Sequence, residues 1–342
     1  MKATEGTTYR MLQSNLGNIT TRLEELRTQG ATGIKLSKPS DDPSSIRPVL
    51  ATRTQIMHTD RYLETMGVTL DKMESTDGHL SHVENILQRV KEITINSINS
   101  AMSQSDLDTF ADEVSNLKAE LIDTANAKVD GKFIFSGYAE NTTPFERNPN
   151  YNPDQTVPIP PPYDKTDSTT WPYLYMGTPN PTELEITPGE ALESNLTGND
   201  LFFGVSNSNW VDSTTPAAGP PPETDRNDIF SILERTEEAL RAGNINDPAG
   251  AGGGLQAKLD ELDVSANQNR RLRSQLGNRA SRVDSAMLAQ EDVSIDLRQI
   301  LSRYQDADAI DTFNAIVQQE TAFQAALSIT SKVSQISILD YF

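Results

Sequence analysis

The prolines of this 342-residue chain are concentrated in one stretch. Fifteen of the 19 prolines lie between Pro144 and Pro222. Because proline removes a backbone hydrogen-bond donor and clashes with the preceding helical turn, this middle third is predicted to be non-helical. The flanking residues are nearly free of proline and can form long helices. The chain is therefore predicted to run out as helices, make a β-rich excursion and return as helices.

The N-terminal flank carries apolar residues at helical spacing. Its first seam, with steps of three and four residues, comprises Tyr9, Leu12, Leu16, Ile19, Leu23 and Leu26. This heptad-like spacing predicts a coiled-coil-like helix. A second helix is predicted from about Ser45 to Ser100, with Pro48 in its first turn. A third is predicted from Ser105 as N-cap, with Asp108 completing a capping box.

The C-terminal flank repeats this pattern. Residues 226–242 predict a short helix, the glycine-rich stretch 250–255 predicts a flexible linker, and an apolar seam follows as far as Leu327. This seam is predicted to continue through Ala307 and Ile310, and it includes Phe313, Val317 and Phe323. Since a narrow seam needs a partner helix, the N- and C-terminal helices are predicted to pack together.

The last apolar residues have no further chain to cover them. They include Phe323, Leu327 and Leu339. An uncovered apolar stripe at a chain end is typical of an interaction surface.

The middle third reads as short strands. The runs KFIFSGY, LEITPG and DLFFGV are rich in β-forming residues and are bounded by Pro, Gly and Asn. The proline-rich residues 149–181 predict an extended loop with few core contacts.

Composition limits the chemistry of the chain. The net charge of −20 argues against nucleic-acid binding, and a chain without cysteine has no disulfide and no thiolate metal site. No apolar run is long enough for a membrane span, and the N-terminus does not read as a cleavable secretory signal. His79 and His82 have a possible metal-ligand spacing but are interpreted as solvated helix residues. No catalytic, cofactor or metal site is predicted.

An arginine run occurs late in the chain. It comprises Arg270, Arg271, Arg273, Arg279 and Arg282. The run is interpreted as an exposed helix face that pairs with acidic residues on a neighbouring helix. Two function classes remain open: a structural subunit that assembles through its terminal helices, and a ligand-binding or catalytic middle domain on a helical stalk. The first is favoured because the middle third has no histidine and no convergent catalytic set.

Several stretches resemble the bacterial flagellin family. GIKLSKPSDDPSSI resembles its signature after the first helix, TANAKVDGKFIFSGYAENTTPF is similar to the segment that closes the helical region in hook–filament junction members, and KVSQISILDYF resembles its C-terminus. The resemblance covers residues 7–148 and 183–342. It implies a structural subunit of the flagellum that links hook to filament, with filament flagellin as the alternative.

The resemblance also implies partners and a location. These are flagellin or other filament-side subunits, another hook-associated protein on the hook side, copies of the same chain in a ring, and a cytoplasmic export chaperone. No nucleic acid, membrane or cofactor is expected. The protein is expected to be extracellular, in the flagellum, after export without a cleavable signal.

The residues and the resemblance together predict an α + β fold of three parts. Residues 1–40 with 305–342 would form a terminal self-assembly region, 41–130 with 226–304 a helical rod, and 131–225 an inserted β-rich domain. Asp42 is predicted to cap the second helix. By the resemblance, its exposed loop, with Ser40 and Asp41, would contact neighbouring subunits.

Overall fold

The computed structural model describes residues 2–36, 38, 42–99, 102–151, 170–205, 226–245 and 254–339, and it describes no side chain of 2–6, 8, 9 or 333–339. The chain divides into two compact units. The first comprises Met1–Arg61 and Gln290–Phe342, and the second comprises Tyr62–Ala289. The three-part division predicted from the sequence stays a prediction. The predicted α + β class, with N- and C-terminal helices and an inserted strand-containing region, is confirmed.

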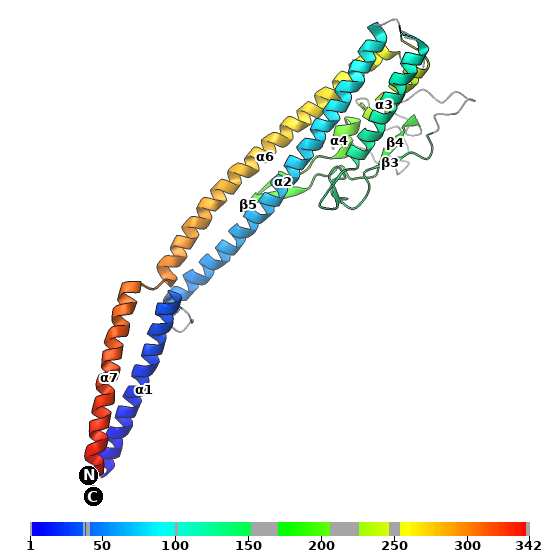
Figure 1. Cartoon of the computed structure of the whole chain (residues 1–342). Coiled ribbons are helices and arrows are strands. Elements are labelled where there is room, and N and C mark those ends of the chain that lie inside the picture. Colours follow the sequence, from blue (N-terminus) through cyan, green and yellow to red (C-terminus); the bar gives the residue numbers. More distant parts are fainter. Residues whose placement is uncertain are drawn as a thin grey trace. The chain divides into compact units, whose positions relative to one another are not determined.

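The first unit is helical throughout its regular elements. Helix α1 (Lys2–Thr32) packs against α7 (Ala309–Leu339), and the unit also holds the start of α2 (Pro43–Asn99) and the end of α6 (Leu255–Gln305) (Figure 1). An ion pair joins Arg27 to Glu320, and the side chain of Thr312 lies close to Gly30. Since the residue numbers run in opposite directions, α1 and α7 are antiparallel, as the two apolar seams predict.

Two helices carry the C-terminal apolar seam. Helix α6 ends at Gln305, and α7 begins at Ala309. Asp308 caps the new helix by accepting hydrogen bonds from the backbone N–H groups of Ile310 (2.8 Å) and Asp311 (3.1 Å). An aspartate in this position stabilises the positive helix N-terminus, which a search for apolar periodicity does not detect.

The predicted cap at Asp42 is confirmed, but α2 begins earlier than expected. One carboxylate oxygen of Asp42 accepts from the N–H of Ser44 at 3.0 Å, and both carboxylate oxygens accept serine hydroxyl hydrogen bonds. These bonds, led by the one from the Ser44 hydroxyl, lower the pKa of Asp42 to about 2. Pro43 occupies the first helical position, where its missing N–H costs nothing, and Pro48 lies inside the helix.

Helix α3 (Gln104–Ala125) also begins earlier than expected. Its N-cap is Ser103, whose hydroxyl accepts from the N–H of Asp106, while the Asp106 carboxylate accepts from the N–H of Ser103. The prediction of Ser105 with Asp108 was wrong because both pairs have the spacing of a capping box. In the second unit α3 packs against α5 (Ile229–Arg241), which confirms the predicted short helix.

The middle region holds three separate two-stranded antiparallel ribbons. They are β1 (Lys128–Val129) with β2 (Lys132–Phe133), β3 (Phe145–Arg147) with β4 (Tyr173–Tyr175), and β5 (Glu183–Thr187) with β6 (Glu190–Glu193). In register, Phe145 faces Tyr175 and Leu184 faces Leu192. The strands predicted in KFIFSGY and LEITPG are therefore present, although the first is only two residues long.

The prediction of a strand in DLFFGV, and of a middle third without helix, was wrong. Residues Gly198–Phe203 form helix α4, which ends at Gly204 with φ of 70°. Leu201, Phe202 and Phe203 are all buried, with at most 1% of each residue exposed. A strand would point alternate residues to opposite faces, whereas one helical turn directs all three into the surrounding core.

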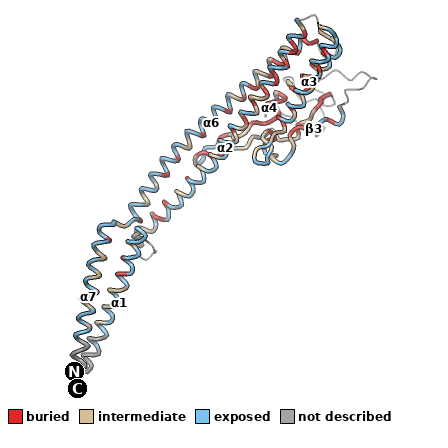
Figure 2. Tube along the Cα trace, in the orientation of Figure 1, coloured by how far each residue is buried: buried red, intermediate tan, exposed pale blue. Residues whose placement is uncertain are grey.

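The core of the middle region is aromatic. Phe145 lies 5.0–5.5 Å, between ring centroids, from Tyr175, Phe202, Phe203 and Phe230. Figure 2 shows this buried region beside α4 and β3. Such ring pairs add to the burial of their apolar area.

The expectation that residues 149–181 lack core contacts is wrong for their described C-terminal part. Trp171 and Tyr175 are each 1% exposed, and the guanidinium carbon of Arg226 lies 3.4 Å from the centroid of the Trp171 ring. Asn148 donates hydrogen bonds to the carbonyls of Trp171 and Pro172. Residues 152–169 lie outside the described part of the chain.

Candidate assembly surface

The α1–α7 pair carries the apolar seams predicted to form a subunit interface. Leu23 and Leu26 are buried within the unit, at 6% and 7% exposure, and Leu12, Leu16 and Ile19 are half-buried. The side chain of Gln319 donates to the carbonyl of Ile19 at 3.3 Å. Only one face of α1 is therefore covered by α7.

Helix α7 leaves its other face uncovered. Phe313 is 67% exposed, Val317 49% and Leu327 44%, whereas Phe323 is half-buried. Thr312 is buried and Ile316 half-buried on the side that approaches Gly30 of α1. Because residues four positions apart share a helix face, the exposed Phe313 and Val317 lie on one stripe away from α1.

Ile310, which is 74% exposed, extends this stripe. It was not among the predicted interface residues, although its spacing from Phe313 and Val317 was visible in the sequence. Ser40 and Asp41 lie outside the described residues, as does the side chain of Leu339. Their predicted interface role stays a prediction, as does that of Asp42.

A short backbone connection joins the segment after α1 to the segment before α7. Ile34 and Asp306 form an antiparallel bridge, with hydrogen bonds from Lys35 N to Gln305 O at 2.7 Å and from Ala307 N to Gly33 O at 2.9 Å. Gly33 takes φ of 69°, which favours glycine. The C-terminal end of α1 is therefore held beside the N-terminal end of α7.

The arginine run of α6 forms part of the second unit's own packing. Arg270 and Arg273 pair with Glu84 and Asp77 of α2, as predicted. Arg271, Arg279 and Arg282 instead pair with acidic residues of α4 and β6. These ion pairs therefore hold α2, α4 and the β5–β6 ribbon against α6.

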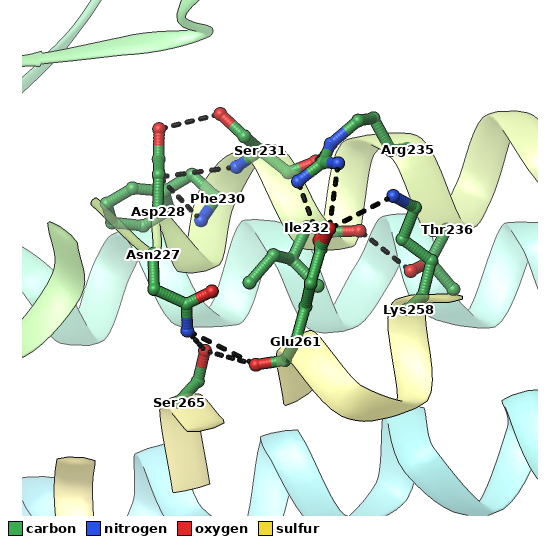
Figure 3. Close-up of polar contacts among 10 residues, drawn as sticks. All are labelled: Asn227, Asp228, Phe230, Ser231, Ile232, Arg235, Thr236, Lys258, Glu261 and Ser265. Atoms are coloured by element: carbon green, nitrogen blue, oxygen red, sulfur yellow. Dashed lines mark hydrogen bonds and ion pairs between the residues drawn. The ribbon is translucent and has the colours of Figure 1, made fainter. Parts of the chain in front are cut away.

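Figure 3 shows a polar cluster between α5 and α6. Arg235 donates to Glu261 at 2.8 Å, and Lys258 lies 3.5 Å from the same carboxylate. Burial, with a smaller effect of Arg235, lowers the pKa of Lys258 to about 8. The Asp228 carboxylate caps α5 by accepting hydrogen bonds from the N–H groups of Phe230 and Ser231 and from the Ser231 hydroxyl. These contacts join α5 to α6, so the charged side chains stabilise the fold.

The histidines predicted to be solvated lie on α2. His82 contacts the Glu120 carboxylate at 2.9 Å, while burial and the neighbouring His82 lower the pKa of His79. Within the described residues no three His, Cys, Asp or Glu side chains gather to hold a metal ion. Among the same residues, none of the helices has the length and apolar character needed to cross a membrane.

Comparison with known proteins finds similarity to proteins of the bacterial flagellum. Residues 6–140 match the family described as the bacterial flagellin N-terminal helical region. Flagellar hook-associated protein 3 of Escherichia coli K12 is 22% identical over 338 residues, and that of Salmonella typhimurium 21% over 342; both alignments cover 97% of each chain. Salmonella typhimurium flagellin is 25% identical over 127 residues, 37% of this chain and 25% of that protein.

Solved structures show the same fold. The crystal structure of hook-associated protein 3 from Legionella pneumophila superposes with a TM-score of 0.56 at 16% identity, covering 75% of this chain and 98% of that chain. A crystal structure of FlgL from Xanthomonas campestris gives a TM-score of 0.54 at 16% identity, covering 73% and 99%.

Residues 6–140 are similar to the flagellin N-terminal helical region, and 97% of the chain is similar to flagellar hook-associated protein 3. The chain therefore resembles structural proteins of the bacterial flagellum.

Proposed function

We propose that this chain is a non-enzymatic subunit of the junction between flagellar hook and filament. The supporting observation is the uncovered stripe of α7, where Ile310, Phe313 and Val317 are 49–74% exposed on a helix already paired with α1. An apolar stripe of this kind needs further helices to cover it, and a flagellar assembly supplies them. The match to hook-associated protein 3 over 97% of each chain supports the position at the junction.

Filament flagellin is the second candidate. It is supported by the match of residues 6–140 to the flagellin N-terminal region. The flagellin relatives align over only 37% of this chain, whereas the hook-associated relatives align over its middle region as well. The junction role is therefore the better supported of the two.

The junction role carries proposals about partners and location. The subunit would contact flagellin or another filament-side subunit, a further hook-associated protein on the hook side, and copies of itself in a ring. It would reach the extracellular flagellum by flagellar export without a cleavable signal, and a cytoplasmic chaperone would cover its C-terminal helix before export. These partners would cover the seams of α1 and α7 and the loop at Ser40–Asp42.

Electron microscopy of cells that lack the gene tests the proposal. A junction subunit predicts intact hooks without filaments and flagellin released into the medium. Loss of the filament protein itself would leave no flagellin in the medium. Normal filaments on the mutant cells would contradict both roles.

Substitution in the stripe tests its part in assembly. Phe313→Asp places a charge in a face that would be desolvated on assembly, and it should abolish filaments while leaving thermal unfolding of the purified chain nearly unchanged. Gln318→Asp, at an exposed polar position of the same helix about 100° around the axis from Val317, is the matched control. Normal filaments with Phe313→Asp would contradict the assembly role of the stripe.

A further inference from the structure

Charge is segregated between two segments of the first unit's sequence. Residues 35–61 contain five Lys or Arg and three acidic residues, whereas residues 290–311 contain six acidic residues and two arginines. The described parts of both segments belong to one unit, and Arg298 of α6 reaches Asp60 of α2 at 3.3 Å. The unit thus presents a basic helix segment and an acidic one, although the whole chain carries −20.

The charges at the centre of each segment have no partner among the residues that the structure describes. Arg47 and Arg53 of α2 are exposed and make no ion pair or hydrogen bond with any described residue. The same holds for Glu291, Asp292 and Asp296 of α6, again among the described residues. In the second unit, by contrast, the arginine run is paired. Unused charges of opposite sign on two faces indicate an interaction between molecules.

Exposed apolar side chains lie among these charges. We define the basic face as Arg47, Leu50, Arg53 and Met57, and the acidic face as Glu291, Asp292, Ile295 and Asp296. Leu50 is 55% exposed, Met57 61% and Ile295 55%. Within each face, successive members lie three or four positions from another member, so each face is one continuous patch on its helix. Each face therefore combines an apolar centre with charges of one sign.

We propose that the basic face of one copy of this chain docks on the acidic face of the next copy. This inference rests on the proposed function, and it names the surfaces that join neighbouring subunits. The two faces differ, so the contact is heterologous and repeats from copy to copy, as a ring or helical array requires. Because every copy carries −20, distant copies repel one another, and the local attraction of the two faces selects the orientation of approach.

Reversing the charges tests the contact. One variant carries Arg47→Glu with Arg53→Glu, a second carries Asp292→Lys with Asp296→Lys, and a third combines all four changes. In cells lacking the natural gene, each of the first two should reduce the number of filaments about tenfold through like-charge repulsion. The third variant should restore filaments, because its acidified α2 face meets a basic α6 face on the neighbouring copy.

The outcomes separate this inference from the proposed function. If the first two variants assemble normally, or if the third is secreted and helical but fails to assemble, the contact between copies is contradicted while the junction role stands. If the third variant fails to assemble and both faces bind purified flagellin, then the faces contact flagellin, and the contact between copies is overturned. If the wild-type gene is not needed for filaments, the proposed function itself fails.

Cross-linking tests the contact without relying on charge reversal. Since the chain has no cysteine, Leu50→Cys and Ile295→Cys create single reactive sites. Cells that produce both variants, each with a different tag, are treated with a bismaleimide. Heterodimers that contain both tags are expected in assembled flagella. Dimers formed only between identical variants, or no dimers in assembled flagella, would overturn the proposal.

Discussion

Replacement of Lys258 by methionine should stabilise the second unit at neutral pH. The Lys258 side chain is 1% exposed, and burial followed by the nearby Arg235 lowers its pKa from 10.5 to about 8 against the attraction of Glu261 and Glu238. Each unit of pKa corresponds to about 1.4 kcal/mol, so the folded protein bears a cost of about 3 kcal/mol for keeping this lysine charged. Methionine keeps most of the buried stem without the charge.

The effect has a defined dependence on pH. The folded-state pKa of Lys258 is below the unfolded value, so the cost is fully present below pH 8 and disappears as the pH rises towards 10.5. Urea unfolding at pH 7 and pH 10.5 should therefore show that the gain from Lys258→Met falls by about 3 kcal/mol between these conditions.

Lys332→Met is the matched control, because Lys332 is an exposed residue of α7. It should change the free energy of unfolding little at either pH. A gain from Lys258→Met that does not change with pH, or a loss of stability at pH 7, would refute the account of the buried cluster.

Three further predictions concern the fold. Trp171→Ala should lower the free energy of unfolding by about 3–5 kcal/mol, because the side chain is buried. Replacing residues 152–169 by a short Gly-Ser linker should leave the melting temperature nearly unchanged, and equal losses of stability in the two variants would contradict the core position of Trp171. Ser103→Ala should cost about 1 kcal/mol and Ser105→Ala much less, and the reverse order in urea titrations would refute the observed cap. In the dilute monomer, amides of residues 12–26 should exchange with solvent faster than those of α2 in the second unit, because α1 has only one partner helix; equal protection would count against this explanation.

The long helices could be predicted because their signal is local. Leucines and isoleucines at steps of three and four residues indicate α1, and proline and glycine bound the middle region. Asp42 could also be recognised as a cap, since the Pro-Ser-Ser that follows it is typical of a helix N-terminus. In each case the residues that determine the structure are neighbours in sequence.

Other features of the fold depend on residues that are distant in sequence. The break between α6 and α7 contains neither glycine nor proline, and its carbonyl and amide groups bond to Gly33 and Lys35 from the other end of the chain. Residues Leu201–Phe203 have the composition of a strand but form a helix because rings from β3, β4 and α5 surround them. Local propensity cannot reveal either contact.

The candidate surface was predicted only in part. Phe313 and Val317 could be selected because they continue an apolar seam, and they are exposed as an interface requires. The basic and acidic faces could not be selected from the sequence. Only the structure shows that Arg47 and Asp292 lack partners among the described residues while Arg273 is paired with Asp77.

The position of the protein in the flagellum distinguishes a junction subunit from a filament subunit. Antibodies against the middle region, or an epitope inserted between residues 152 and 169, can be located by immunogold electron microscopy on intact flagella. The account predicts label in one narrow band where hook meets filament. Label distributed along the length of the filament, or absent from the flagellum, would contradict it.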